Sequence, residues 1–133
     1  MVLYRFEGKE PRIGEGTCVS QSAEVIGDVT IGKYCYIVTV GHGSILHNCT
    51  VKNYAVIGMG TIVSDYAVVG VWSVVGEGCV VKNKQVIEDH KIVVGVPARI
   101  VGELSKDYQR LWTSYKSLYA KLALKYPETL EET

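Results

Sequence analysis

The chain has 133 residues, enough for one modest domain with an appendage, and its 47% hydrophobic content is sufficient for a core. Fourteen basic and fourteen acidic residues balance to zero net charge, so the basic excess typical of nucleic-acid binders is absent and we expect no nucleic-acid partner. No run approaches the length of an apolar membrane span, and Arg5, Glu7 and Lys9 lie where a signal peptide needs an apolar stretch. We therefore expect a cytoplasmic protein without a membrane partner.

The first predicted element is a short strand over residues 2–6, because Val2, Tyr4 and Phe6 alternate with Leu3 and Arg5. Residues 8–11 contain glycine and proline and predict a turn. A six-residue repeat then begins. It has an aliphatic residue at every sixth position and a compact residue four places later, the aliphatic ones being Ile13, Val19, Val25, Ile31 and Ile37 and the compact ones Thr17, Ala23, Val29 and Cys35.

The same repeat resumes at Val40 and continues to Val81, six residues apart except for one five-residue step. Its compact positions are Ser44, Thr50, Ala55, Thr61, Ala67, Ser73 and Cys79. A fixed period of six is typical of a parallel β-helix, in which three hexads form one turn. Residues eighteen apart should then stack, as Val51 over Val69, with the aliphatic and compact side chains inside. The fold class predicted is mainly β, with the strand over residues 2–6 capping the open end.

The last segment changes to a helical period. Residues 92–101, with a Gly-Val-Pro-Ala turn, lead off the β-helix; Ser105 is the predicted N-cap, and Pro127 the predicted end of the helix. We expect the apolar stripe of this helix and its aromatic residues to pack on the β-helix or on a neighbouring subunit. The stripe consists of Leu104, Tyr108, Leu111, Tyr115, Leu118 and Leu122. The aromatic residues are Tyr108, Trp112, Tyr115 and Tyr119. The predicted division is therefore a β-helix domain over residues 1–102 and an α-helix over residues 103–133.

Two histidines, His42 and His47, are the candidate functional residues. They fall at neither inward position of the repeat, so both should lie on the outer wall within reach of a neighbouring subunit. Neutral imidazole is a good zinc ligand, and a catalytic zinc site takes three protein ligands and a water, although two such histidines are also common as ordinary surface residues. For a third ligand the chain offers His90, expected to be a solvated loop residue, and Cys49, which follows His47 by two positions and could reach an outward metal, although its register does not specifically favour this.

The remaining titratable residues receive no catalytic role from the sequence. Cys18, Cys35, Cys49 and Cys79 show no C-x-x-C spacing and are predicted to be reduced, packed thiols. Asp65 and Glu77 lie at turn positions, which are usually polar in a β-helix. No cofactor other than a metal is expected.

The motif G-H-G-S-I-L-H-N-C-T (residues 41–50), followed by V-I-G-M-G-T-I-V (residues 56–63), resembles the γ-class carbonic anhydrase family, including its ferripyochelin-binding and hexapeptide transferase-like relatives. Residues 4–8, 25–32 and 93–99 extend the resemblance along the chain. It implies a left-handed β-helix, a homotrimer, and a zinc or iron ion held by His42 of one subunit and His47 of its neighbour. Metal-bound hydroxide would then convert carbon dioxide to bicarbonate, a lyase reaction.

The chain departs from this family between Ile37 and Val40, where only half a hexad separates the two repeat blocks. The family carries a long segment here with an Arg-Gly-Asp stretch, a glutamine-bearing stretch and the first of three metal-binding histidines, none of which is present. Two alternatives therefore stand beside hydration: a hexapeptide acyl-CoA-dependent acyltransferase with a histidine as general base, and a non-catalytic trimeric scaffold, which the missing segment favours. The acyltransferase would need a loop for its donor, and the chain has no obvious long insertion.

Overall fold

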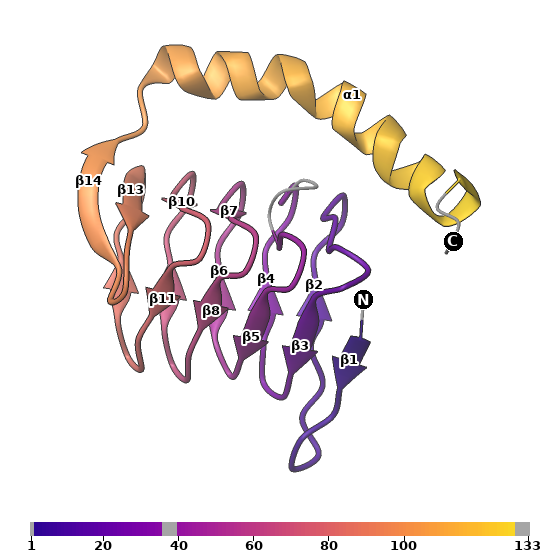
Figure 1. Ribbon diagram of the computed structural model, residues 1–133, viewed down its shortest axis with the longest axis vertical. Coiled ribbons are helices and arrows are strands. Elements are labelled where there is room, and N and C mark those ends of the chain that lie inside the picture. The colour runs from indigo at the N-terminus through magenta and orange to yellow at the C-terminus, as the bar shows by residue number, and fades with distance from the viewer. Residues whose placement is uncertain (1, 36–39, 130–133) are drawn as a thin grey trace.

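The computed structural model describes residues 2–35 and 40–129, which form a solenoid of short strands followed by one long helix (Figure 1). The first seven strands are β1 (Val2–Tyr4), β2 (Arg12–Ile13), β3 (Glu24–Ile26), β4 (Thr30–Ile31), β5 (Ile45–His47), β6 (Thr50–Val51) and β7 (Val56–Ile57). The others are β8 (Ile62–Val63), β9 (Val68–Val69), β10 (Val74–Val75), β11 (Val80–Val81), β12 (Val86–Ile87), β13 (Lys91–Val94) and β14 (Arg99–Glu103), and α1 is Lys106–Thr129.

Three sheets form the three faces of a triangular prism. The first face has the order β1-β3-β5-β8-β11, the second β12-β9-β6-β4-β2, and the third β14-β13-β10-β7. All pairs are parallel except β13 with β14, which turns back and ends the solenoid. Val51 pairs with Val69, as predicted from the eighteen-residue turn. The short strand at the start is also confirmed, since β1 pairs with β3 at the edge of the first face.

The core is the predicted aliphatic column, closed at the corners by small side chains. Every aliphatic position of the second repeat block, from Val40 to Val81, is fully buried. One compact position was predicted wrongly: Thr50 points outward, and Cys49 is buried in its place with 2% of its surface exposed. The five-residue step from Leu46 to Val51 removes one residue before the corner, so the inward position falls one residue earlier.

Close stacking of the turns explains the glycines that follow the aliphatic positions. A Cβ atom on Gly58 would lie 2.6 Å from the backbone nitrogen of Glu77 in the next turn, and one on Gly41 would lie 2.6 Å from that of Met59. Neither contact can be relieved by moving a side chain, because the neighbouring atom is backbone.

One corner carries a ladder of aromatic residues in the left-handed backbone region. Tyr34, Tyr54 and Trp72 have φ angles of 53°, 60° and 56°. The rings of Tyr34 and Tyr54 stack with centroids 5.6 Å apart, and those of Tyr54 and Trp72 with centroids 4.7 Å apart and 3° between their planes. Ring stacking therefore accompanies a backbone conformation that most side chains disfavour.

The walls of the prism continue across the junction between the two repeat blocks. Residues 36–39, which include the predicted inward Ile37, lie outside the described part of the chain. Beyond them Val40 is fully buried and pairs with Val19 and Ile57. Val25 pairs with Leu46, twenty-one residues later, whereas Leu46 pairs with Val63, seventeen residues later, and Val51 with Val69, eighteen residues later. The sheets on either side of the junction therefore stay in register although the lengths of the turns differ.

Helix α1 crosses back over the solenoid toward its N-terminal coils (Figure 1). Its predicted N-cap is confirmed, since the Ser105 hydroxyl accepts a 3.1 Å hydrogen bond from the Tyr108 backbone N–H. Its predicted end was wrong, because the helix continues through Pro127 to Thr129. In this last turn the proline removes a single backbone hydrogen bond, which does not end the helix.

The chain at α1 contacts its own solenoid through Leu104, a residue of the predicted stripe that precedes α1, and through Trp112, one of the aromatic residues predicted to pack. Leu104 and Trp112 lie against the third face beside Val56, Val74 and the aromatic ladder. The other stripe residues whose side chains are described are exposed in the single chain, by 40% for Tyr108, 48% for Leu111, 47% for Tyr115 and 54% for Leu118, so their packing on a neighbouring subunit stays a prediction. Trp112 thus lines one small pocket with the aromatic ladder, and its side of α1 faces the third face of the solenoid.

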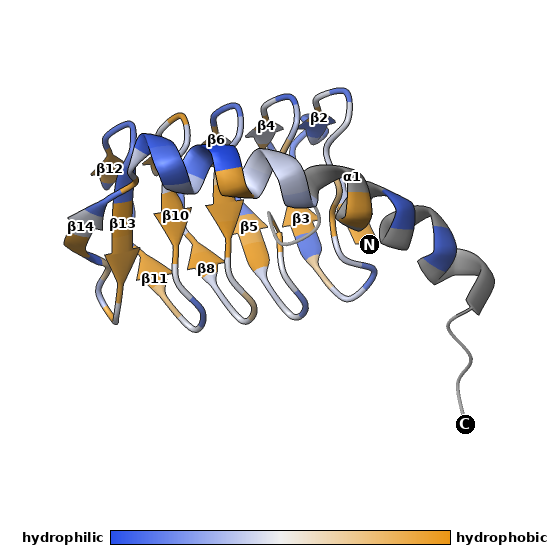
Figure 2. Cartoon of the chain, turned by 90° about the horizontal axis from the view of Figure 1, so that it is seen from above, coloured by the Kyte–Doolittle hydropathy of each residue, from blue (hydrophilic) through white to orange (hydrophobic). Residues whose placement is uncertain are grey.

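Hydrophobic residues concentrate in the strands and hydrophilic ones in the corner turns (Figure 2). In the described part of the chain, no stretch of α1 is both long enough and apolar enough to cross a bilayer.

Candidate functional site

A histidine and a carboxylate meet on the outer wall, where the first face turns into the second. His47 ends β5, and its Nδ1 atom contacts the Oδ1 atom of Asp65. The parallel pairing of β5 with β8 produces this contact, because Leu46 pairs with Val63 and so brings the turn after β8 beside His47. The side chains are 35% and 36% exposed, so the pair is accessible while partly shielded from water.

Asp65 was predicted to have no role, and its contact with His47 was not foreseen from the sequence. His47 and Asp65 are eighteen residues apart, one turn of the solenoid, and this separation was the signal that could have paired them. A carboxylate accepts a hydrogen bond, so in the neutral form of the ring Nδ1 of His47 carries the hydrogen and Nε2 presents a lone pair.

His42 lies at the opposite edge of the first face, in the turn before β5. Its Nδ1 atom is 2.6 Å from the Ser20 hydroxyl and 3.2 Å from the Ser22 hydroxyl, both from the preceding turn of the solenoid. The Ser22 hydroxyl also accepts a 3.2 Å hydrogen bond from the Gly43 backbone N–H. His42 is therefore held by neutral hydroxyl groups, whereas His47 contacts a carboxylate.

Within one chain the two histidines do not fit a shared metal ion. They lie at opposite ends of β5, and a strand advances about 3.3 Å per residue, whereas zinc needs each ligand nitrogen at about 2.0–2.1 Å. In the part of the chain that the structure describes, no three histidine, cysteine, aspartate or glutamate residues gather as a metal-binding group.

Neither candidate third ligand lies beside His47 as a metal ligand would. Cys49 points into the core, where burial raises the pKa of its thiol to about 12 and keeps it protonated. His90 is more than a solvated loop residue: its Nδ1 atom is 2.8 Å from Nε2 of Gln109, and its carbonyl accepts a 2.8 Å hydrogen bond from the Leu104 backbone N–H. His90 thus joins the solenoid to α1. The structure describes all four cysteines, and each is a free thiol.

Phe6 packs against the outer side of the His47–Asp65 pair. Its ring centroid is 6.1 Å from that of His47, with the planes tilted by 49°. The turn that carries it is tight, because Phe6 and Lys9 exchange two backbone hydrogen bonds of 3.0 Å. The N-terminal turn therefore contributes an apolar wall to this corner.

A polar hollow of about 300 Å³, which we call the corner hollow, lies on the other side of Phe6. Its lining residues are Phe6, Glu7, Lys9, Arg12, Asp28, Thr30, Asn48, Thr50 and Tyr66. Asn48 and Tyr66 directly follow His47 and Asp65 in the sequence, so the hollow and the pair share one corner.

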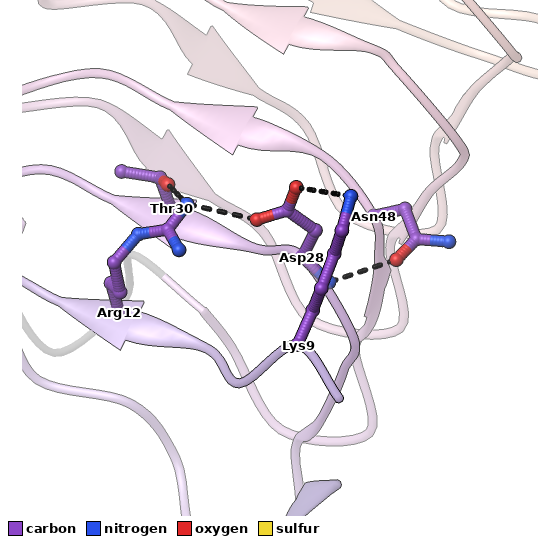
Figure 3. Close-up of polar contacts among 5 residues, drawn as sticks. All are labelled: Lys9, Arg12, Asp28, Thr30 and Asn48. Atoms are coloured by element: carbon purple, nitrogen blue, oxygen red, sulfur yellow. Dashed lines mark hydrogen bonds and ion pairs between the residues drawn. The ribbon is translucent and has the colours of Figure 1, made fainter. Parts of the chain in front are cut away.

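Asp28 organises the cations of the corner hollow (Figure 3). Lys9 Nζ lies 3.2 Å from one carboxylate oxygen, and an Arg12 nitrogen lies 2.8 Å from the other. The same Arg12 nitrogen donates a 3.0 Å hydrogen bond to the Thr30 hydroxyl, and the Asp28 backbone N–H donates one of 2.8 Å to Asn48 Oδ1. Hydrogen bonds from Lys9 and then Arg12 hold the pKa of Asp28 below its usual value.

No family model matches the chain. It is 30% identical over 174 aligned positions to the carnitine operon protein CaiE of Salmonella typhi, an alignment that covers 100% of this chain and 87% of that relative. Because the chain has 133 residues, at least 41 aligned positions have no counterpart in it. This agrees with the prediction that relatives carry a segment which this chain lacks.

Two solved structures illustrate the likeness of fold. A putative acetyltransferase of Bacillus cereus is 21% identical with a TM-score of 0.66, covering 96% of this chain and 98% of its own. A mutant of GDP-perosamine N-acetyltransferase from Caulobacter crescentus, in complex with CoA and GDP-perosamine, is 29% identical with a TM-score of 0.56. That match covers 70% of this chain and 51% of the Caulobacter chain.

The class defined by the fold is the left-handed parallel β-helix built from hexapeptide repeats, with a single C-terminal helix. Since CaiE is matched over nearly its whole length, the chain belongs to the hexapeptide-repeat β-helix family that includes CaiE. The resemblance stated from sequence is thereby supported at the level of the family; neither CaiE nor the two structures above is named a carbonic anhydrase.

Proposed function

We propose that this protein transfers an acyl group from an acyl-CoA to a hydroxyl or amine acceptor, with His47 as the general base. The observation that carries the proposal is the contact between His47 Nδ1 and Asp65 on the outer wall. A histidine oriented in this way at an accessible surface is suited to taking a proton near neutral pH.

In the proposed reaction, the acceptor oxygen or nitrogen attacks the thioester carbonyl while His47 Nε2 takes its proton. The carbon–sulfur bond then breaks, and the leaving CoA thiolate takes up that proton, so the products are the acylated acceptor and free CoA. Asp65 acts as a positioning residue: it fixes the ring tautomer and stabilises the imidazolium that forms between the two steps.

The names of the structural neighbours support acyl transfer over carbon dioxide hydration. The Caulobacter relative is an N-acetyltransferase that contains CoA, at 29% identity, while the Bacillus neighbour supports the fold alone. The present chain spans about half of the Caulobacter protein, so that protein's acceptor is not carried over to this chain.

Self-association, as a homotrimer, is part of the proposal. Apart from the exposed Glu24, the outward side of the first face is largely apolar, with exposed fractions of 43% for Val2, 44% for Tyr4, 37% for Ile45 and 40% for Ile62. Three copies with their first faces around one axis would cover these residues in a closed ring. Each ring contact would bring the His42 edge of one copy toward the His47 edge of the next, and an acyl-CoA could lie between them.

A metal-dependent hydration of carbon dioxide is the second candidate. One observation favours it: a carboxylate on Nδ1 is also the arrangement that orients metal-binding histidines. The single chain does not fit the ion, so the site would need His42 of one copy and His47 of another. Metal content per chain, measured on anaerobically purified wild type and His42→Ala, tests it: about one metal that vanishes in the variant supports the site, and an equal content in both proteins removes it.

The proposed acyl transfer is tested by titrating the wild type with acetyl-CoA in a calorimeter, then incubating it with acetyl-CoA and a panel of amines and alcohols and detecting acylated products by mass spectrometry. We expect saturable donor binding and at least one acylated acceptor. Absence of acetyl-CoA binding at millimolar concentration would remove the proposal and leave the scaffold alternative.

A further inference from the structure

The corner hollow is rich in hydrogen-bond donors that the chain itself leaves unused. Lys9 and Arg12 supply cationic donors, and Thr50 and Tyr66 supply hydroxyl groups. The lining contains only two carboxylates, Asp28 and Glu7. Both oxygens of Asp28 already accept hydrogen bonds from the cations, so Asp28 offers little to a ligand that carries donors of its own.

The two cations keep donor capacity directed at solvent. Lys9 makes one ion pair among the described residues, with Asp28, although an ammonium group has three N–H donors. Arg12 uses one terminal nitrogen for both Asp28 and Thr30, and its guanidinium has further N–H groups on its other two nitrogens. Their side chains are 63% and 64% exposed, so these donors are accessible.

Asp28 fixes the positions of Lys9 and Arg12 but offsets only one of their two positive charges. One carboxylate holds two positive groups, and the backbone N–H of Asp28 is in turn fixed by Asn48. Donors held in place in this way lose less conformational entropy when a ligand binds than mobile surface lysines would. With Glu7 counted, the charged residues of the lining sum to zero, so an anion would be held by the fixed donors of Lys9 and Arg12 rather than by a net charge of the hollow.

The size and walls of the hollow limit the ligand to a small molecule. Its volume of about 300 Å³ is at the lower end of the range of ligand sites, about 300–1,000 Å³. Phe6 and Tyr66 give it aromatic walls, and the Tyr66 side chain is open, with 69% of its surface exposed. Phe6 is also the residue whose ring lies 6.1 Å from that of His47.

We propose that the corner hollow binds the acid group, a carboxylate or a phosphate, of a small organic ligand through Lys9, Arg12 and Tyr66. The assignment of that ligand as the acyl acceptor rests on the proposed function: a molecule anchored here would extend past Phe6 toward the general base His47. The substrate class is then an amine or alcohol that also carries an acid group. Binding of the acid group itself requires no acyl transfer.

The test is calorimetric titration of the intact protein, without acyl-CoA and at constant ionic strength, with three probes: succinate, inorganic phosphate and the neutral analogue succinamide. Arg12→Gln removes one cation of the hollow. Lys82→Gln removes one positive charge from an exposed site outside the lining residues and is the matched control. Tyr66→Phe removes a single hydroxyl and no charge, so it keeps the test informative even if Arg12→Gln fails to fold.

We expect saturable binding of at least one anion, a Kd at least about tenfold higher in Arg12→Gln, about threefold higher in Tyr66→Phe, and within twofold of wild type in Lys82→Gln. Binding of succinate alone identifies a carboxylate, and binding of phosphate alone a phosphate. The proposal is overturned if neither anion binds, if succinamide binds as tightly as succinate, or if Lys82→Gln weakens binding as much as Arg12→Gln.

These outcomes are separable from those for the proposed function. Acid binding that depends on Arg12, in a protein that transfers no acyl group, leaves the hollow as a binding site and removes the enzyme. Acylation of neutral acceptors by a protein that binds neither anion would keep the acyltransferase and remove the acid-binding site.

Discussion

The Nδ1 atom of His47 contacts the Oδ1 atom of Asp65 across one turn of the solenoid. His47 ends β5, and Asp65 lies in the turn after β8, the next strand of the first face, whose register is fixed by the buried pair Leu46 and Val63. The positions of the core side chains therefore determine the geometry of this surface pair.

Asp65→Asn is expected to lower the kcat of acyl transfer by about 100-fold with little change in KM, because the amide no longer fixes the reactive tautomer of His47. Glu77→Gln is the matched control, since Glu77 is another acidic turn residue on a neighbouring coil and has no such contact among the described residues. The double variant Asp65→Asn with His47→Asn should be no slower than His47→Asn alone. Independent, additive losses would show that Asp65 does not act through His47.

Gly58→Ala is expected to destabilise the fold by about 2–3 kcal/mol, because the added Cβ would meet the backbone nitrogen of Glu77 at 2.6 Å. Gly60→Ala separates sterics from backbone strain: Gly60 has no atom within 4 Å of the added Cβ, and its φ is 66°. We expect a cost of about 1 kcal/mol there. Urea unfolding measures both, and equal losses would contradict the close stacking of the turns.

Cys49 is expected to make stability fall at high pH. Its pKa is raised to about 12 in the fold, above the ordinary value of 9.0 for a thiol, so its contribution is full below pH 9 and is lost as pH rises from 9 toward 12. Between these values the wild type should lose up to about 1 kcal/mol per pH unit more than Cys49→Ala. Unfolding by urea at pH 8, 9 and 10 checks this, and parallel slopes for the two proteins would contradict it.

Asp28 is expected to act in the opposite direction, at acid pH. Lys9 and Arg12 lower its pKa below 3.8 in the fold, so its contribution is present above that value and is lost as pH falls through the lower pKa. Asp28→Asn should therefore be less stable than wild type at pH 7, and the difference should shrink at pH 3. Thermal unfolding of both proteins measures it; a difference that does not change with pH would show that the ion pairs contribute nothing.

The hexapeptide period predicted the solenoid because burial repeats with it. Val51 stacks on Val69 and Val63 on Val81 without any information beyond the spacing. The single five-residue step misplaced Thr50, since a count of six cannot show which side of the corner loses the residue. Periodicity predicted an apolar stripe that packs on the solenoid or on a neighbouring subunit, but it could not show which of its residues meet the solenoid; of the stripe and its aromatic neighbours, Leu104 and Trp112 lie beside the third face.

The candidate site could be predicted only in part. The spacing of His42 and His47 placed both on the outer wall, but the partner of His47 depends on stacking between turns. The cluster of Lys9, Arg12 and Asp28 was missed for a different reason: Lys9 comes from the N-terminal turn, before the repeat begins, so no period relates it to Asp28. Non-repeating segments contribute side chains that a repeat pattern cannot place.

The most direct measurement is the rate of CoA release from acetyl-CoA, with an acceptor that the product screen has identified, for the wild type, His47→Asn and His90→Asn. His90 is a histidine of the same chain that holds α1 and lies outside the proposed site. We expect a loss of at least about 100-fold in His47→Asn and a rate within about threefold of wild type in His90→Asn. Full activity in His47→Asn, or an equal loss in both variants, would contradict a general-base role for His47.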